Sequence, residues 1–193
     1  MTTSLGFQLL FAMLGRGGAL FLKGVPQETF KALSLYCVQS AIVTSDGLSD
    51  FVEFANESPS YECHLDTIFC VESSLSPDVI NQARSRLCAN ISVGYHLTEC
   101  GMVSSMPVQF GSEKKGAAGF IMPGTLVQIV GDDGTILTAN KAGRVRLKSR
   151  AAVNEYLQDP SASSIMFRDD WFYPGDIGYL TEENMLFLIA KPL

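Results

Sequence analysis

The sequence predicts a mixed α/β fold, in which a parallel sheet flanked by helices is followed by a small antiparallel β subdomain, a distorted barrel. Over residues 1–95, short β-rich apolar runs alternate with segments whose apolar residues recur at helical spacing. This alternation is typical of a parallel sheet with crossover helices. After Gly101, closely spaced glycines and short apolar runs indicate antiparallel strands joined by turns. We therefore expect an α/β subdomain over residues 1–105 and a β-rich subdomain over residues 106–193.

The elements of the first half follow from local signals. The clearest is the start of a helix at Ser76, which can cap it, with Pro77 at the first helical position and Asp78 near the positive end of the helix dipole. Ser45 or Asp46 is expected to cap an earlier helix. The other expected helices cover residues 6–14, as a short buried helix, and the segment after Pro26; the expected strands cover residues 19–22, 41–43, 67–71 and 91–95.

The second half is expected to consist of short strands. These cover residues 126–130 and 145–147 and recur in the tail from 171 to 191, which turns at residues 182–184. A helix is expected over residues 151–157. The apolar segment at residues 6–14 is too short to span a bilayer and has no basic leader, so we expect neither a transmembrane segment nor a signal peptide.

Composition restricts the class of protein. The chain has 193 residues, of which 47% are hydrophobic and 18% are charged, so it can bury a sizeable core. A net charge of −6 without a basic patch argues against nucleic acid as a partner. Five cysteines, an odd number without CxxC spacing, indicate a reduced, cytoplasmic protein in which Cys37, Cys70 and Cys88 are small buried hydrophobes.

Residues 95–101, YHLTECG, place an aromatic ring, a hydroxyl and a carboxylate just after an apolar run. Ligands bind outside the carboxyl ends of the strands in open α/β sheets, so Tyr95, Thr98 and Glu99 are candidate site residues. The Thr98 hydroxyl can donate a hydrogen bond to a phosphate, and the Glu99 carboxylate can hold Mg²⁺. Taken alone, position and composition favour a simpler interpretation, an ordinary strand end with incidental polar residues.

A second stretch, residues 171–179 with the sequence WFYPGDIGY, holds Asp176 beside a glycine turn. A carboxylate in such a turn can accept hydrogen bonds from two ribose hydroxyls. Alone, this stretch too is best interpreted as an ordinary turn. Together, in this order and separation, the two stretches resemble the adenylate-forming superfamily of acyl- and aryl-CoA synthetases, carrier-protein adenylation domains and luciferases.

The sequence around these stretches agrees with the resemblance, which covers essentially the whole chain. Residues 119–124, GFIMPG, look like the family's Gly-x-Pro-x-Pro-Gly turn, and residues 156–160, YLQDP, look like its Tyr-x-x-x-Pro helix end. Residues 132–134 and Gly143 fall where the family has a hairpin and a Gly-led strand. Residues 75–77 resemble the start of the helix that follows the family's adenine-side loop.

The resemblance implies an enzyme with two half-reactions. A carboxylic acid attacks the α-phosphate of ATP–Mg²⁺ to give an acyl-adenylate and pyrophosphate, and a thiol of CoA or of a carrier's phosphopantetheine arm then takes the acyl group. By matched position, Thr98 would bind a phosphate, Glu99 would hold Mg²⁺ and Tyr95 would flank the adenine. Asp176 would bind the ribose hydroxyls, and Lys191 falls where an Arg usually contacts the ribose.

Several positions depart from the family's pattern. His96 replaces a usual Gly, and Pro174 stands where a Thr usually precedes the Gly-Asp pair. Glu72 and Ser73 occupy a commonly Gly-rich loop on the adenine side, which makes them candidate nucleotide-binding residues and puts a charge near the expected pocket. Lys191 is a point charge and lacks the bidentate fork of Arg.

The chain lacks parts that the resemblance would lead us to expect. It contains no Ser/Thr/Gly-rich loop ending in Lys, which binds pyrophosphate in the family, and neither the family's upstream sheet nor its mobile carboxyl-terminal domain. We therefore expect the central fragment of a longer ligase, without its N- and C-terminal parts and nearly inactive alone. The alternative is a non-catalytic module, derived from the family, that binds a nucleotide, an acyl group or a protein.

Two further expectations concern what the chain binds. Amino-acid-activating members of the family usually carry an Asp in the region aligned with residues 2–7, and none occurs here. The substrate is therefore expected to be a fatty, aromatic or other plain carboxylic acid. If a missing sheet normally covers part of the chain, apolar surface is exposed, and weak self-association is expected.

Overall fold

A computed structural model describes residues 4–22, 26–58, 65–71, 75–110, 114 and 116–190 of the chain. The chain forms two compact units. The first unit comprises Met1–Val93 with Pro107–Glu113, and the second unit comprises Gly94–Met106 with Lys114–Leu193. Each unit is described by itself.

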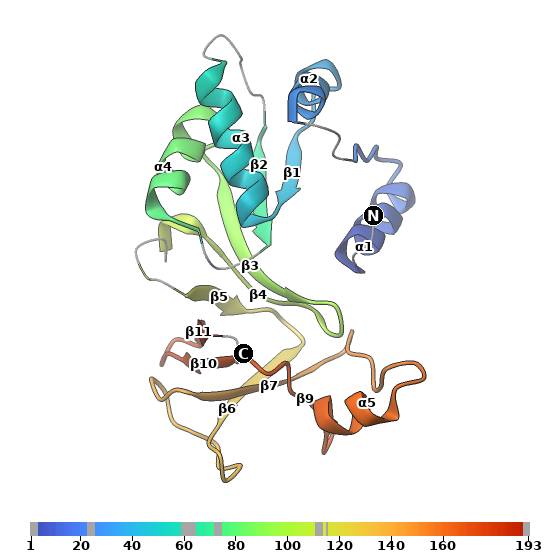
Figure 1. Cartoon of the computed structure of the whole chain (residues 1–193), viewed down its shortest axis with the longest axis vertical. Helices are drawn as coiled ribbons and strands as arrows, with labels where there is room; N and C mark the ends of the chain where they lie inside the picture. The colour runs from blue at the N-terminus through green and yellow to red at the C-terminus, as the bar shows by residue number, and fades with distance from the viewer. Residues whose placement is uncertain are drawn as a thin grey trace. The chain divides into compact units, whose positions relative to one another are not determined.

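The first unit is built of helices and parallel strands (Figure 1). Strands β1 and β2 pair in parallel, with Ser40 opposite Thr67 and Val43 opposite Cys70. Strand β3 is the next neighbour of β2 in the sheet and runs on into the second unit. The elements are α1 (Ser4–Gly15), α2 (Pro26–Leu35), β1 (Ser40–Val43), α3 (Ser45–Glu57), β2 (Thr67–Val71), α4 (Pro77–Arg86), β3 (Ile91–Leu97) and the 3₁₀ turn η1 (Val108–Phe110).

Side-chain caps fix the starts of two helices in this unit. The Ser76 hydroxyl accepts a hydrogen bond from the Val79 backbone N–H at 3.2 Å, so the predicted cap of α4 is confirmed. The cap of α3 is Thr44, whose hydroxyl accepts from the Gly47 N–H at 3.2 Å. The prediction of Ser45 or Asp46 was therefore wrong by one or two residues, because any short hydroxyl or carboxylate side chain in this run can cap.

Aromatic side chains pack α2 against α3. The ring of Phe30 is fully buried and lies 4.9 Å from that of Phe51 and 4.3 Å from that of Phe54. Leu48 and Ile68 are also buried. The apolar faces of these elements therefore form the core of the first unit, as their helical and strand spacings predict.

The amino-terminal prediction was partly wrong. Helix α1 forms over Ser4–Gly15, but none of its residues is buried, and Phe7, Phe11 and Leu14 are 51%, 69% and 64% exposed. Residues 18–22 adopt no regular secondary structure, since an apolar run becomes a strand only beside a partner strand. The expected self-association stays a prediction, for which α1 is a candidate surface. Within the described residues, no helix is both long and apolar enough to cross a bilayer.

The second unit is strand-rich. Its path of neighbouring strands runs β3-β4-β5-β11-β10-β7-β9-β8, with β6 paired to β7 in antiparallel. Strands β4 to β11 pair in antiparallel wherever their register is described, which confirms the mixed fold class. The path does not close on itself, so the expected barrel does not form among the described strands. The elements are β4 (Gly101–Pro107), β5 (Ala117–Ile121), β6 (Thr125–Val130), β7 (Gly143–Ser149), α5 (Pro160–Met166), β8 (Phe167–Arg168), β9 (Trp171–Phe172), β10 (Ile177–Leu180) and β11 (Met185–Ala190).

Two elements of this unit differ from the prediction. The helix expected over residues 151–157 is not formed; α5 begins later, at Pro160, where the Asp159 carboxylate accepts from the Ala162 N–H at 2.9 Å. Strand β4 was not predicted. Its close contact with β5 depends on Gly119, which has φ +104°, since an added Cβ would lie 2.5 Å from the Ser105 carbonyl carbon.

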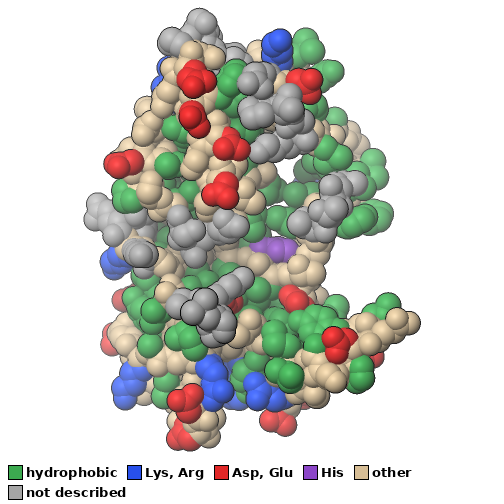
Figure 2. All heavy atoms as spheres, viewed as in Figure 1, with side chains coloured by type: hydrophobic (Ala, Val, Ile, Leu, Met, Phe, Trp, Pro, Cys, Tyr) green, Lys and Arg blue, Asp and Glu red, His purple; other side chains and the backbone are tan. Residues whose placement is uncertain are grey.

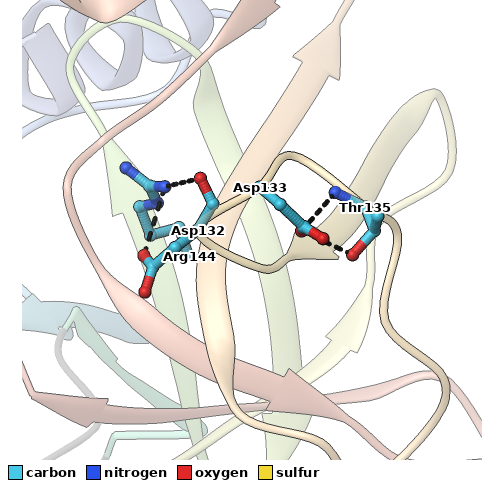
Figure 3. Close-up of polar contacts among 4 residues, drawn as sticks. All are labelled: Asp132, Asp133, Thr135 and Arg144. Carbon is cyan, nitrogen blue, oxygen red and sulfur yellow. Dashed lines mark hydrogen bonds and ion pairs between the residues drawn. The ribbon is translucent and has the colours of Figure 1, made fainter.

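Polar contacts within two pairs of residues fix the loop between β6 and β7 (Figure 3). The Asp133 carboxylate accepts hydrogen bonds from the N–H and the hydroxyl of Thr135, at 3.0 and 2.7 Å, and these hold the pKa of Asp133 below its usual value. Arg144 forms an ion pair with the Asp132 carboxylate at 3.2 Å. On the face shown in Figure 2, acidic and basic side chains are interspersed over this unit, as expected for an ordinary solvated surface.

The turn between β8 and β9 offers a test of backbone strain. Its two residues, Asp169 and Asp170, have φ of 51° and 61°, which is the type I′ geometry that favours glycine at the second position. We expect Asp170→Gly to raise the free energy of unfolding by about 0.5 kcal/mol relative to Asp170→Ala. Both variants lose the exposed ion pair of Asp170 with Lys148. The difference between their melting temperatures in thermal unfolding therefore reports the effect of the backbone conformation at residue 170. Equal melting temperatures would contradict this account.

The described cysteines are free thiols. Cys70 and Cys88 are buried, as predicted, and Cys100 is buried in the second unit. Cys37 is exposed and has φ 48° in the turn after α2, so its prediction as a buried hydrophobe was wrong.

Candidate functional site

The first candidate stretch forms the end of β3 and the turn after it. Tyr95 lies on β3 and is 8% exposed, in the same hydrophobic core as Cys100 and Leu147. The strand continues through His96 and Leu97, and residues 98–100 form the turn into β4. This geometry buries the ring of Tyr95 and leaves Thr98 exposed at the turn.

The hydroxyl of Tyr95 donates a hydrogen bond to Oδ2 of Asp176. Asp176 is 2% exposed, and its backbone carbonyl accepts from the Val145 N–H at 2.9 Å. Gly175, with φ +83°, makes the turn that brings the carboxylate to this position. Burial raises the pKa of Tyr95 far above its usual value, and the carboxylate raises it further, so the phenol remains protonated and acts as the donor.

A second tyrosine holds Glu99. The hydroxyl of Tyr156 donates to Oε1 of Glu99 at 2.8 Å, and the Glu99 backbone carbonyl accepts from the Val153 N–H at 2.9 Å. Burial and then the hydrogen bond to Glu99 raise the pKa of Tyr156 to about 12. The Glu99 carboxylate is thus anchored through one oxygen.

Cys100 follows Glu99 and is 1% exposed. Burial, and next the charge of Glu99, raise the pKa of its thiol to about 12. Only the thiolate is a strong nucleophile, so Cys100 is unsuited to covalent catalysis and serves as a packed core residue.

His96 has a buried Nε2 without a hydrogen-bond partner among the described residues. Burial lowers the pKa of His96, and the charge of Glu99 only partly offsets this effect. The unfolded chain therefore takes up a proton near pH 6.5 that the folded chain resists, and stability is lost as the pH falls below about 6.5.

We accordingly expect the native chain to lose stability faster than His96→Gln between pH 7 and pH 5, in urea unfolding followed by the fluorescence of Trp171. Gln is polar and of similar size but does not titrate. Parallel pH profiles of the two proteins would show that His96 makes no such contribution.

The predicted site residues that the structure describes all lie in the second unit. Tyr95 and Asp176, 81 positions apart, are in direct contact. The charge of Glu99 makes a small contribution to the raised pKa of Tyr95. Glu72, Ser73 and Lys191 lie outside the described residues. Sequence reasoning missed the contact of Tyr156 with Glu99, although its Tyr-x-x-x-Pro pattern drew attention to this segment.

The oxygen-rich turn suits Mg²⁺ better than a softer metal. Among the described residues, no group of three or more His, Cys, Asp and Glu side chains could hold a metal ion without other ligands. Mg²⁺ is commonly bound by one or two carboxylates together with phosphate oxygens and water. The hydroxyl of Thr98 and the carboxylate of Glu99 fit that arrangement only if a phosphate is also present.

A separate hollow of about 370 Å³ lies beside β7 and the β8–β9 hairpin. It is lined in part by Lys148, Asp170 and Trp171. The cations of Arg146 and Lys148 lie 4.6 and 4.9 Å from the centre of the Trp171 ring. These cation–π contacts explain the cluster as surface side chains that stabilise one another, without a bound ligand. Neither Glu99 nor Asp176 lines this hollow.

Comparisons with known proteins place the chain in a family. Residues 1–157 match the family model described as AMP-binding enzyme. The chain is 32% identical over 109 residues to 4-coumarate–CoA ligase 2 of Nicotiana tabacum, covering 53% of this chain and 20% of that protein. It is 29% identical over 149 residues to 4-coumarate–CoA ligase 1 of Arabidopsis thaliana, covering 71% of this chain and 26% of that protein. The chain therefore spans about a quarter or less of the length of these relatives.

Solved structures show the same fold. Unliganded O-succinylbenzoate coenzyme A synthetase of Bacillus subtilis superposes with a TM-score of 0.85 at 20% identity, over 98% of this chain and 40% of that one. The same enzyme in complex with ATP and a magnesium ion gives a TM-score of 0.83 at 20% identity, over 98% and 39% of the two chains. At 20% sequence identity, these superpositions show that the chains share a fold and nothing more specific.

Proposed function

Because the chain belongs to the family of AMP-binding enzymes, we propose that it is the nucleotide- and acyl-binding part of an ATP-dependent acid–thiol ligase. In the reaction, an oxygen of the substrate carboxylate forms a bond to the α-phosphorus of ATP. The bond from that phosphorus to the oxygen that bridges the α- and β-phosphates breaks, and pyrophosphate leaves. The sulfur of a thiol then bonds to the acyl carbon and loses its proton, while the bond from that carbon to the AMP oxygen breaks and AMP leaves. The names of the relatives support CoA as the thiol and an aromatic acid as the substrate.

The observation that carries this proposal is the contact between two distant motifs. Tyr95 and Asp176 are joined by a hydrogen bond, and Thr98 and Glu99 occupy the turn that follows β3, the strand that carries Tyr95. The segment from Tyr95 to Glu99 thus offers an aromatic ring and oxygen ligands for a metal–phosphate group. Asp176, which contacts this segment, offers a carboxylate for the ribose.

Asp176 would act through both carboxylate oxygens. Oδ2 accepts from Tyr95, which fixes the ring of that residue, and Oδ1 would accept from the ribose hydroxyls. Asp176 is 2% exposed. Its carboxylate would therefore reach a ribose only if the nucleotide packs directly against the hydrogen-bonded side chains of Tyr95 and Asp176. Thr98, which is exposed, would donate to a phosphate, and Glu99 would hold Mg²⁺.

Calorimetric titration with nucleotides tests the proposal. We expect the chain to bind ATP in the presence of Mg²⁺, and Asp176→Asn, which keeps an acceptor for Tyr95, to bind more weakly. GTP serves as the control for adenine recognition. Absence of ATP binding, or binding unaffected by Asp176→Asn, would refute the assignment of the nucleotide site to these residues.

Acid-dependent exchange of pyrophosphate into ATP separates the ligase from the non-catalytic alternative. Turnover is proposed to need groups from the part of the relatives' fold that this chain does not span, because much transition-state stabilisation comes from preorganised charges around the phosphates. The chain alone is therefore expected to bind ATP without exchange, whereas a hybrid in which it replaces the matching segment of the tobacco relative should exchange. A hybrid that folds and binds ATP without exchange would favour the non-catalytic module.

A further inference from the structure

Tyr156 makes a contact that the motif roles do not explain. It lies 57 positions after Glu99, and its hydroxyl donates to Oε1 of that carboxylate at 2.8 Å. Both residues are partly buried and belong to the second unit. Among the described residues, no other side chain forms a hydrogen bond or ion pair with the Glu99 carboxylate.

The segment that carries Tyr156 also fixes the backbone of Glu99. The Val153 N–H donates to the Glu99 carbonyl at 2.9 Å, three residues before the tyrosine. Glu99 is therefore held at its carbonyl and at its carboxylate by one short segment. Two such contacts restrict the side chain far more than either does alone, because the carboxylate cannot swing away while the backbone stays in place.

Tyr156 is itself held in place. Its backbone N–H donates to the Ser163 hydroxyl at 2.9 Å, and that hydroxyl also donates to the Asp159 carbonyl at 2.6 Å. Its ring packs edge-on against Phe167 with centroids 5.3 Å apart, and Phe167 lies 4.9 Å from Phe172 in the core. The hydroxyl is thus presented to Glu99 from a supported position, as expected of a group that orients a ligand.

We infer that Tyr156 is a positioning residue for Glu99: its hydroxyl holds Oε1 and leaves Oε2 available to a divalent cation that accompanies a bound nucleotide. The inference rests on the proposed role of Glu99. Hydrogen bonds from outer residues orient metal-binding carboxylates, and their loss typically lowers metal affinity about 10- to 100-fold. The chain offers a matched comparison in Tyr179, whose half-buried ring stacks on Phe187 in the same unit.

Calorimetric titration of the chain with ATP, once with Mg²⁺ and once with EDTA, tests the inference. Tyr156→Phe is expected to weaken ATP binding about tenfold with Mg²⁺ and to leave binding in EDTA unchanged. Tyr179→Phe is expected to change neither. Equal weakening of Tyr156→Phe in both conditions would show that the hydroxyl supports only the fold and would overturn the inference, as would no change in either.

A second readout keeps the inference testable if the native chain binds no nucleotide, a result that would refute the proposed function. The tyrosines are labelled with ¹³C at Cζ, and the Tyr156 resonance is identified by its loss in Tyr156→Phe. Glu99→Gln is expected to shift this resonance, and Mn²⁺ alone is expected to broaden it in the native chain but not in Glu99→Gln. A resonance that neither moves with Glu99→Gln nor broadens with Mn²⁺ would overturn the inference independently.

Discussion

Replacing Tyr95 by Phe is expected to lower the free energy of unfolding by about 3 kcal/mol at pH 7. The hydroxyl donates to Asp176, and the two residues are 8% and 2% exposed. Phe keeps the ring but leaves a buried carboxylate oxygen without its donor. Urea unfolding followed by the fluorescence of Trp171, the single tryptophan of the chain and part of the same unit, measures the effect.

Two comparisons separate the lost hydrogen bond from other causes. Tyr179→Phe removes a hydroxyl from a half-buried ring in the same unit and is expected to cost less than about 1 kcal/mol. Asp176→Asn keeps an oxygen that can accept from Tyr95 and is expected to cost less than Tyr95→Phe. A Tyr95→Phe variant within about 0.5 kcal/mol of the native chain would contradict the burial of an essential pair.

The same pair gives a pH dependence on the alkaline side. Tyr95 ionises near pH 10 in the unfolded chain, whereas its pKa in the folded chain is raised well above that value by burial and by Asp176. The folded chain therefore retains a proton that the unfolded chain loses, and stability falls as the pH rises above about 10. Tyr95→Phe should have a flatter profile in this range.

Glu99→Gln is expected to weaken Mg²⁺-dependent ATP binding about 100-fold while leaving binding in EDTA and stability nearly unchanged. The amide oxygen can still accept from Tyr156, so the variant removes the charge and keeps the contact. Calorimetry with and without Mg²⁺ measures the binding. In a hybrid ligase with the complete fold, acid-dependent exchange of pyrophosphate into ATP should fall by a similar factor.

The matched control for this variant is Glu182→Gln. Glu182 is exposed in the turn between β10 and β11, so its replacement removes one negative charge from the same unit without touching the Glu99 turn. Its ATP binding should equal that of the native chain. If Glu182→Gln and Glu99→Gln weakened binding alike, net charge would explain the loss and Glu99 would have no special role.

The sequence predicted those elements whose signals are local. Ser76 and Pro77 correctly predicted the start of α4. The apolar run at Thr67–Val71 forms β2 with the bounds that were predicted. The failures had two causes: an apolar run without an intrinsic preference, and a local helix-start signal that was overlooked. Residues 18–22 are apolar but have no described strand beside them, and the start of α5 was misplaced although Asp159 and Pro160 carry the cap and first-turn signals.

The candidate site was predicted residue by residue but not pair by pair. Motif matching selected Tyr95, Glu99 and Asp176 and assigned each to a part of a nucleotide. It could not show that the Tyr95 hydroxyl contacts Asp176 or that the Tyr156 hydroxyl contacts Glu99, because these contacts join residues 81 and 57 positions apart that only the folded chain brings together. The structure thus adds to the expected roles a tyrosine donor for each carboxylate.

The distribution of buried thiols makes the two units separately observable. Cys70 and Cys88 are buried in the first unit and Cys100 in the second, whereas Cys37 is exposed. A buried thiol is alkylated only while its surroundings open, so pulse labelling under native conditions reports local opening free energies. Peptide mass spectrometry then assigns each rate to a cysteine, with Cys37 marking the rate of unprotected reaction. Matching rates for Cys70 and Cys100 would mean that the units open as one cooperative body, and different rates would rank their stabilities.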